Sequence, residues 1–298
     1  MTTNKTLIFV GAHPDDETFG MGSTLAKYAA AGVKVYYVCA TRGEAGSAEP
    51  EYLEGYASTA EMRCAEMASA AKVLNLAGVI YLGYRDSGMP GTPDNQNPDS
   101  LMQAPVEQVV ARLVKIFREL KPDVVITHDP SGGYAHPDHI ATHNATIKAF
   151  SAAGDSSAYP EAGPAFQPAK LYFGVRSHRL MKFMVKLMPL FRQNPHKFGR
   201  NGDIDLTKMV SVEYPIHATV RLSKKDLEIR TKAAACHASQ GGGRPPSRGR
   251  GMFGLVNSFF NITNRIFGYH DYFMRAYPLP DEKHRESDLF EGLDNKKP

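Results

Sequence analysis

Two short clusters of histidine and carboxylate side chains contain the residue types best suited to chemistry. Residues 12–17 read AHPDDE, and residues 134–139 read YAHPDH about 120 positions later. In each cluster an imidazole and a carboxylate stand a few residues apart, so both can reach one point. Zinc in a catalytic site takes three such protein ligands and keeps one position for water. Together the clusters predict a metal-dependent hydrolase.

The ligand types indicate how such a site would work. His13 and Asp16 lie three residues apart on a predicted turn that opens a helix, and His139 is a natural third ligand. Two imidazoles and one carboxylate suit Zn²⁺, and also Fe²⁺, Co²⁺ or Mn²⁺, so the identity of the ion stays open. A bound ion lowers the pKa of its water to about 7. Asp15 could then accept the proton of that water, and His136, as a cation, could stabilise the oxyanion and protonate the departing amine.

Structural explanations of the same residues stand beside this one. Residues 15–17 could form only an acidic helix N-terminus, and His136 and His139 could be buried histidines with ordinary partners. Short motifs match by chance. Because both clusters follow a predicted strand and their ligand types are complementary, the functional interpretation is favoured. In it, Asp138 would favour the imidazolium form of His136 if its carboxylate hydrogen-bonds that ring.

Two further histidines lie close to the second cluster in the sequence. His128 follows the fourth predicted strand, where we expect it to support the site or to have a structural role. His143 lies one helical turn beyond His139. Because three ligands are already present, we do not expect His143 to bind the ion.

Strands must alternate with helices to position these residues. Hydrophobic runs predict strands at 7–10, 33–39, 79–82 and 124–127, and helices at 17–31, 61–76, 106–120 and 138–150. Short strands that alternate with longer helices are typical of βαβ units, and indicate an α/β, Rossmann-like fold whose parallel sheet is covered on both faces. Ligands bind beyond the carboxyl ends of such strands. Both clusters follow a strand, so the chemistry and the topology agree.

The second half of the chain is less regular. It contains candidate strands at 171–175 and 210–214 and a candidate helix at 224–239. Residues 241–251 are rich in Gly and Pro, which predicts a mobile loop. We therefore divide the chain into a Rossmann-like catalytic core, residues 1–176, and a C-terminal extension, residues 177–298, that completes the sheet and the rim of the active site.

The composition excludes several classes of protein. Apolar residues make up 42% and charged residues 22% of the 298 positions, which excludes a wholly disordered chain. The cysteines Cys39, Cys64 and Cys236 are too few and too far apart for a disulfide framework or a thiolate zinc site, and they favour a reducing compartment. No run approaches the roughly 20 apolar residues of a membrane span. The net charge of +4 is small and no nucleic-acid reader motif occurs, so we expect a cytoplasmic protein that does not bind nucleic acid.

The sequence resembles the LmbE-like, or PIG-L, family of N-acetylglucosaminyl deacetylases. Besides the two clusters, the resemblance rests on TRGE at 41–44, RCAE at 63–66 and LGYRDSGM at 82–89. It covers about residues 5–150, and beyond them little more than CHASQ at 236–240. It implies a Rossmann-like fold, usually zinc, and hydrolysis of an acetamide on a glucosamine-type sugar to amine and acetate.

Carried over to the matching positions, the resemblance implies a catalytic set. The metal ligands would be His13, Asp16 and His139. Asp15 would be the general base, and His136 would be an acid-donating imidazole that Asp138 orients. Tyr134 would place a hydroxyl near the carbonyl oxygen.

The resemblance also implies contacts with a small amino-sugar substrate. Arg63 and Asp86 would bind sugar hydroxyls or the attached group, and Glu44 would line the pocket. From the residues alone, Arg63 could simply pair with Glu66 on one helix face, and Asp86 could belong to an ordinary turn. Family members that act on inositol-linked or malate-linked glucosamine are the obvious models for the substrate. Amidases of thiol conjugates and antibiotic-tailoring deacetylases share the motifs and stay as alternatives.

Two basic, hydrophobic segments are not explained by the family pattern. Residues 179–200 hold six Lys or Arg and no Asp or Glu, and residues 252–275 are aromatic-rich with few acids. The first could contact an anionic membrane or an apolar substrate, although a core-facing helix with a solvated basic face is favoured. Either segment could form an oligomer interface. A non-catalytic module that binds a sugar or a lipid surface is a further alternative, but binding alone needs neither Asp15 nor His136.

Overall fold

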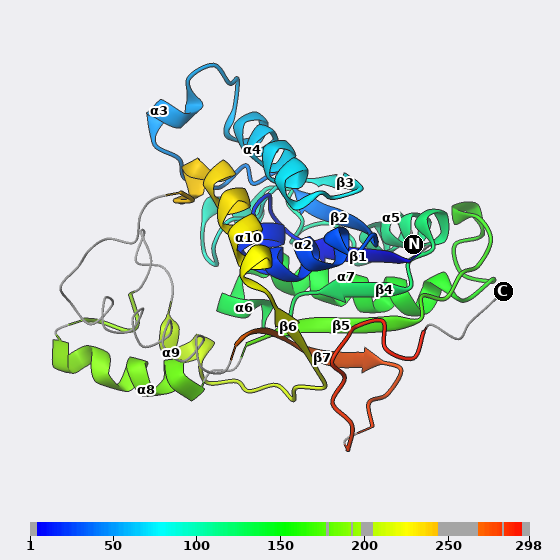
Figure 1. The fold of residues 1–298 in the computed structure, drawn as a ribbon. Coiled ribbons are helices and arrows are strands. Elements are labelled where there is room, and N and C mark those ends of the chain that lie inside the picture. The colour runs from blue at the N-terminus through cyan, green and yellow to red at the C-terminus, as the bar shows by residue number, and fades with distance from the viewer. Residues whose placement is uncertain are drawn as a thin grey trace.

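A mostly parallel sheet with helices on both faces organises the chain (Figure 1). The computed structural model describes residues 5–176, 179–191, 193–197, 205–243, 268–281 and 283–293. Within these ranges the architecture is α/β, which confirms the predicted fold class.

The seven strands of this sheet follow the order β3-β2-β1-β4-β5-β7-β6. Their bounds are β1 (Thr6–Gly11), β2 (Lys34–Thr41), β3 (Gly78–Tyr84), β4 (Val124–Thr127), β5 (Lys170–Val175), β6 (Ala218–Leu222) and β7 (Tyr269–Tyr277). Strands β1 to β5 pair in parallel, whereas β7 is antiparallel to both of its neighbours, β5 and β6. The C-terminal part of the chain therefore extends the same sheet.

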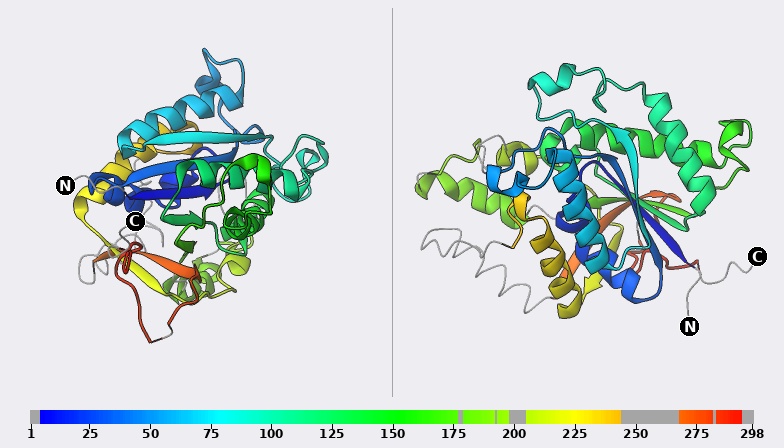
Figure 2. Two further views of the ribbon diagram at one scale, coloured as in Figure 1. Left: turned by 90° about the vertical axis from the view of Figure 1, so that its right-hand side faces the viewer. Right: turned by 90° about the horizontal axis from the view of Figure 1, so that it is seen from above.

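Helices pack on both faces because successive side chains of a strand point to opposite sides. Ile8 and Val10 of β1 belong to the core under α5 and α7, whereas Leu7 and Phe9 belong to the core under α2 and α4. Helix α10 lies against α2 and α4 (Figure 2).

The α-helices are α1 (Asp16–Phe19), α2 (Gly22–Ala30), α3 (Pro50–Leu53), α4 (Thr59–Leu74), α5 (Val106–Leu120), α6 (Gly132–Ala135), α7 (Pro137–Ala153), α8 (Arg179–Leu187), α9 (Leu206–Met209) and α10 (Lys224–Cys236). The 3₁₀ helices are η1 (Pro93–Gln96), η2 (Pro160–Ala162), η3 (Met188–Phe191) and η4 (Ala238–Gln240).

The strand order reverses between β1 and β4. From β1 the chain moves outward to β2 and β3 on one side, and it then returns to β4 and continues to β5 on the other side. Val10 of β1 pairs with Thr127 of β4, so the two strands end side by side. Such a reversal point is where open α/β sheets bind ligands. Both histidine–carboxylate clusters follow these two strands.

Two of the predicted elements are wrong. The helix predicted at 17–31 is broken into α1 and α2 around Gly20 and Met21, and glycine is a poor helix former. No strand forms at 210–214, where Pro215 follows directly and has no backbone N–H to donate to a strand ladder. The strand that pairs with β7 begins later, at Ala218.

The basic segment at 179–200 is described in part, as α8 and η3. Val185 and Met188 are buried, as the core-facing interpretation requires, but Phe183 is 58% and Leu190 76% exposed. Residues 244–251 of the predicted mobile loop and residues 252–267 of the second basic segment lie outside the described residues. None of the helices in the described ranges combines the length and the apolar composition needed to cross a bilayer.

Candidate metal centre

The loop after β1 is held in place by the side chain of Asp16. Its Oδ2 accepts hydrogen bonds from the backbone N–H groups of Ala12 and His13, both at 2.9 Å. Asp15, which directly precedes Asp16, has a backbone φ of 144°, a value that residues other than glycine rarely adopt. Strained backbone of this kind persists where surrounding contacts fix it, and it concentrates at functional sites.

The second cluster lies at the start of α7. His136 is the N-cap residue, and its Nδ1 accepts a hydrogen bond from the backbone N–H of Asp138 at 3.2 Å. Pro137 occupies the first helical position, where its missing N–H is not needed. Just before the helix, a Cβ at Gly132 would lie 3.1 Å from Cβ of His139. Only glycine lets the loop approach the helix this closely.

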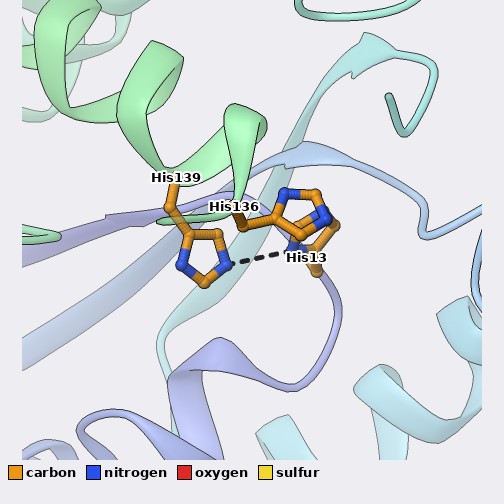
Figure 3. Close-up of side chains that lie close together, drawn as sticks. All are labelled: His13, His136 and His139. Carbon is orange, nitrogen blue, oxygen red and sulfur yellow. Dashed lines mark hydrogen bonds between the residues drawn. The ribbon is translucent and has the colours of Figure 1, made fainter. Parts of the chain in front are cut away.

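The two loops bring the three predicted metal ligands together. His13 Nδ1 lies 3.2 Å from His139 Nε2, as Figure 3 shows, and His139 Nε2 lies 3.4 Å from Asp16 Oδ1. The closest approach of His13 Nδ1 to Asp16 is 3.9 Å, at Oδ2. Atoms bound to one tetrahedral zinc ion lie roughly 3.3–3.6 Å apart. The first two separations are close to this range, whereas His13 and Asp16 lie farther apart than one tetrahedral ion would hold them.

A carboxylate behind His13 supports the same interpretation. His13 Nε2, the nitrogen facing away from His139, lies 3.3 Å from Asp138 Oδ2 and 3.5 Å from Asp86 Oδ1. Metal-bound histidines usually donate their second N–H to a carboxylate, which fixes the ring. Burial opposes a charge on His13, but these carboxylates raise its pKa well above the usual value.

This arrangement corrects the expected role of Asp138. Its carboxylate contacts His13 and accepts a hydrogen bond from Ser87 N–H at 2.9 Å. Only its backbone N–H reaches His136. The reason is helix geometry: the side chain at an N-cap faces the N–H groups of the first turn, not their side chains.

Burial bears on the expectation that His136 acts as a cation. Burial, reinforced by the neighbouring His13 and His139, lowers the pKa of His136 to about 2, which favours the neutral imidazole. Because Nδ1 accepts a hydrogen bond, the N–H of that neutral ring is on Nε2. The role of His136 in proton transfer stays a prediction.

Asp15 is the carboxylate of the first cluster that pairs with Arg63. Its Oδ2 accepts a hydrogen bond from Arg63 Nη2 at 2.9 Å. Burial raises the pKa of Asp15 to about 6, against the opposing effect of Arg63. Carboxyl groups poised near neutral pH are suited to general acid–base chemistry.

Arg63 itself is buried, and both of its terminal nitrogens contact the protein. Besides Asp15, it donates to the carbonyl oxygens of Pro14 at 2.8 Å and Gly43 at 3.3 Å. A Cβ at Gly43, whose φ is +71°, would collide with the guanidinium, so glycine is required there. The alternative pairing with Glu66 does not form, because the carboxylate of Glu66 binds Ser239.

The other predicted substrate residues border the same site. Asp86 is buried, accepts from Gly88 N–H at 2.8 Å and faces His13. Glu44 accepts from Asp86 N–H at 3.0 Å. Tyr134 is 36% exposed, and its ring lies 5.2 Å from that of His139. Direct contact of these side chains with a sugar stays a prediction.

A cavity of about 730 Å³ adjoins this site. It lies between the segment after β2, the first turns of α4 and the end of β3, and its lining includes Arg42, Glu44, Tyr56 and Arg85. Of the predicted site residues this lining includes Glu44, whose carboxylate accepts the N–H of Asp86.

Sequence reasoning missed one buried contact near the centre. Glu17 and His237 are both fully buried, and Nε2 of His237 lies 2.8 Å from Oε1 of Glu17. This pair ties the first cluster to the segment after α10. The CHASQ motif at 236–240 was the available signal, but nothing in its spacing identifies Glu17 as the partner.

Comparisons with known proteins identify a family from the sequence and a shared fold from solved structures. A family model described as PIG-L, GlcNAc-PI de-N-acetylase, matches residues 8–150. A 1D-myo-inositol 2-acetamido-2-deoxy-alpha-D-glucopyranoside deacetylase from Geodermatophilus obscurus is 40% identical over 307 residues, which cover 98% of this chain and 99% of the relative. The solved N,N'-diacetylchitobiose deacetylase of Pyrococcus horikoshii shares the fold with a TM-score of 0.60, at 22% identity and over 93% of this chain and 84% of its own. A teicoplanin deacetylase, solved in a zinc-inhibited form, also shares the fold, with a TM-score of 0.55 at 17% identity. That match covers 92% of this chain and 100% of the teicoplanin deacetylase chain.

Proposed function

Since this chain belongs to the PIG-L family of deacetylases, we propose that it is a metal-dependent N-deacetylase that hydrolyses the acetamide of a small N-acetylglucosamine-containing molecule. One observation carries the proposal: His139 Nε2 lies 3.2 Å from His13 Nδ1 and 3.4 Å from Asp16 Oδ1, beside a carboxyl group on Asp15 that is left for proton transfer. Zinc is the ion we propose, held by His13, Asp16 and His139.

The ion and the residues around it would have different roles in the reaction. When bound, the ion supplies Lewis-acid activation of water and of the acetamide carbonyl. Asp15 accepts the proton of the attacking water, because Arg63 keeps its carboxyl anionic close to neutral pH despite burial. With a pKa of about 6, Asp15 can afterwards return that proton to the departing nitrogen.

His136 stabilises the negative charge that develops on the carbonyl oxygen. Its Nδ1 is occupied by the N–H of Asp138, so Nε2 carries the N–H that is left to donate. A neutral imidazole that donates from a water-poor site is an effective oxyanion partner. Tyr134, on the partly exposed loop before it, would add its hydroxyl.

The substrate class follows from the relatives and from the cavity. The Geodermatophilus relative is named for an acetamido-glucopyranoside of inositol. We propose that Arg63, Asp86 and Glu44 border the sugar and that the 730 Å³ cavity takes its substituent. The cavity lining includes two arginines and two glutamates, with Arg42 3.4 Å from Glu44. Donors and acceptors in equal number suit an uncharged polyol better than a strongly anionic group.

Two observations bear on the proposed setting of the enzyme. The three cysteines are free, which agrees with the cytoplasm that we propose. Exposed Phe183 and Leu190 on α8 and η3, with exposed Lys186 between them, support a peripheral contact with a membrane or an apolar substrate.

The direct test measures released primary amine. The purified protein is incubated with N-acetylglucosaminyl-inositol and with N-acetylglucosamine, with and without chelator and zinc add-back. We expect amine and acetate in equal amounts, loss with chelator and recovery with zinc. A zinc-loaded protein that releases no amine from a broad panel of acetamido sugars would overturn the proposal, and release of a different acid would move it to the thiol-conjugate amidases.

A further inference from the structure

Two arginines line the cavity of about 730 Å³, and each has a carboxylate partner. Arg42 Nε lies 3.4 Å from Glu44 Oε1. Arg85 Nη2 donates a hydrogen bond to Asp94 Oδ1 at 2.7 Å. Glu44 and a second glutamate, Glu61, belong to the lining, and Asp94 does not. The positive charge of the cavity wall is therefore compensated by the protein itself.

A buried amide side chain holds the turn that carries Asp94. This residue lies in η1, and the next residue, Asn95, is buried. Asn95 Oδ1 accepts a hydrogen bond from Gly91 N–H at 2.7 Å, and its Nδ2 donates to the backbone oxygen of Met89 at 3.2 Å. The position of the Asp94 carboxylate is therefore set by the fold of its own loop.

The backbone of Arg85 is fixed as well. Its N–H donates to the backbone oxygen of Asp99 at 3.0 Å, and its own oxygen accepts from Leu101 N–H at 2.9 Å. The hydrogen bond with Asp94 raises the pKa of Arg85, and the charges of further carboxylates nearby act in the same direction. Arg85 is therefore a cation whose charge is already met by Asp94.

The balance of charge decides which groups the cavity can accept. Its two glutamates match its two arginines, and Asp94 adds a third carboxylate at Arg85. An anionic group would have to displace Asp94 from Arg85, and it would meet the like charges of Glu44 and Glu61. Hydroxyl groups both donate and accept, so a polyol can bind the same side chains while the ion pairs stay intact.

We propose that Asp94 sets the charge selectivity of the cavity: by holding Arg85, it excludes an anionic substituent and leaves an uncharged polyol as the group that fits. Asp94 is a positioning residue, because it acts through Arg85 and does not touch the substrate. The inference rests on the proposed function, in which the cavity takes the substituent of the amino sugar. Stability does not explain the pair, because ion pairs with 36% and 31% of their side-chain surfaces exposed contribute little to it.

The test compares three substrates that share the acetamido sugar. The substituent is an uncharged polyol in N-acetylglucosaminyl-inositol and carries two carboxylates in N-acetylglucosaminyl-malate, and N-acetylglucosamine has none. We measure kcat/KM for amine release in the wild type and in Asp94→Asn, which keeps an acceptor oxygen but removes the charge. We expect the wild type to prefer the inositol compound. Asp94→Asn should raise kcat/KM for the malate compound relative to the inositol compound on the order of 10-fold, with little change for N-acetylglucosamine.

Two further variants show whether the effect passes through Arg85. Asp94→Asn/Arg85→Gln lacks the guanidinium that Asp94 no longer neutralises, so the gain for the malate compound should disappear. Asp99→Asn removes the same charge from an exposed position on the same loop and should keep the wild-type ratio. Melting temperatures should stay within about 3 °C of the wild type, because exposed ion pairs contribute little to stability. If Asp94→Asn fails to fold, Asp94→Ser replaces it.

The outcomes separate this inference from the proposed function. An unchanged ratio in Asp94→Asn, a gain that persists without Arg85, or a wild type that prefers the malate compound would each overturn the role of Asp94 and leave the deacetylase activity standing. A zinc-loaded wild type that releases amine from none of the three substrates would overturn this inference, and the broader panel of acetamido sugars then decides on the proposed function.

Discussion

Arg63 Nη2 donates to Asp15 Oδ2 at 2.9 Å, and both side chains are withdrawn from solvent, with 4% and 19% of their surfaces exposed. The guanidinium therefore acts on the one carboxyl group that we assign to proton transfer. Burial raises the pKa of Asp15 to about 6, and the opposing charge of Arg63 keeps it from rising further.

Removing that charge should shift the pH dependence of catalysis. In Arg63→Met the pKa of Asp15 rises, because burial is no longer opposed. A general base with a higher pKa is deprotonated only at higher pH, so the acidic limb of the kcat/KM profile should move upward by about one pH unit or more. Arg63→Lys, which keeps the charge, should show the smaller shift. An unmoved acidic limb in Arg63→Met would contradict the assignment of Asp15 as the base.

Metal binding and proton transfer should separate in two variants. His139→Ala removes a ligand, so the purified protein should contain much less zinc than the wild type. Asp15→Asn keeps all three ligands and should hold a full equivalent of zinc while kcat falls roughly 10²- to 10⁴-fold. Elemental analysis beside initial rates makes the comparison. Loss of zinc in Asp15→Asn would mean that Asp15 is needed to hold the ion.

The buried pair of Glu17 and His237 should make stability depend on pH. Burial disfavours a charge on His237, but the hydrogen bond to Glu17 raises its pKa above the ordinary value near 6.5. The contribution of this pair to the free energy of unfolding is therefore complete below about pH 6.5, and it is lost as the pH rises through the higher pKa of His237 in the folded state.

Glu17→Gln tests this dependence in the chelated protein. Disrupting a buried pair costs about 3 kcal/mol or more, so the free energy of unfolding should fall most at pH 6, and the difference from wild type should shrink at pH 8 and above. Glu291→Gln breaks the exposed pair with His284 and is the matched control, with little expected effect. A difference that is the same at every pH would show that His237 is neutral in the fold.

Arg118 should be essential for stability and irrelevant to the site. Its buried guanidinium donates to six backbone oxygens between Ala152 and Gly163, which fixes the segment between α7 and β5. Arg118→Met leaves these oxygens without their donors, and we expect a loss of about 2–4 kcal/mol in urea unfolding. Zinc content should not change. A loss below about 0.5 kcal/mol would mean that water replaces the guanidinium.

The parallel half of the sheet could be predicted because its signals are local. The run at 124–127 is entirely apolar or β-branched, and the strand has those bounds. Strand β7, YHDYFMRAY, carries charged and polar residues throughout, so no alternating pattern marks it. Its place between β5 and β6 depends on pairing across about a hundred residues, which no local pattern encodes.

In the candidate site, too, the features with local signals could be predicted and those that depend on the fold could not. The residue types of His13, Asp16 and His139 predicted that they would meet, because strand ends and ligand chemistry are both visible in a sequence. The partner of the Asp138 carboxylate was not visible: His136 is two residues away, yet the contact is made with His13, 125 positions distant. Burial decides the protonation state of His136, and burial is a property of the folded protein.

Strand β7 has a consequence for how the protein is made. It is the last strand of the sheet in the sequence but lies between two earlier ones, β5 and β6. While the ribosome is still translating residues before 269, neither of these strands has its partner, and each leaves backbone N–H and C=O groups unpaired. Unpaired strand edges promote association between chains. The nascent chain therefore carries two such edges until synthesis has passed Tyr277, the stage at which chaperones would hold it.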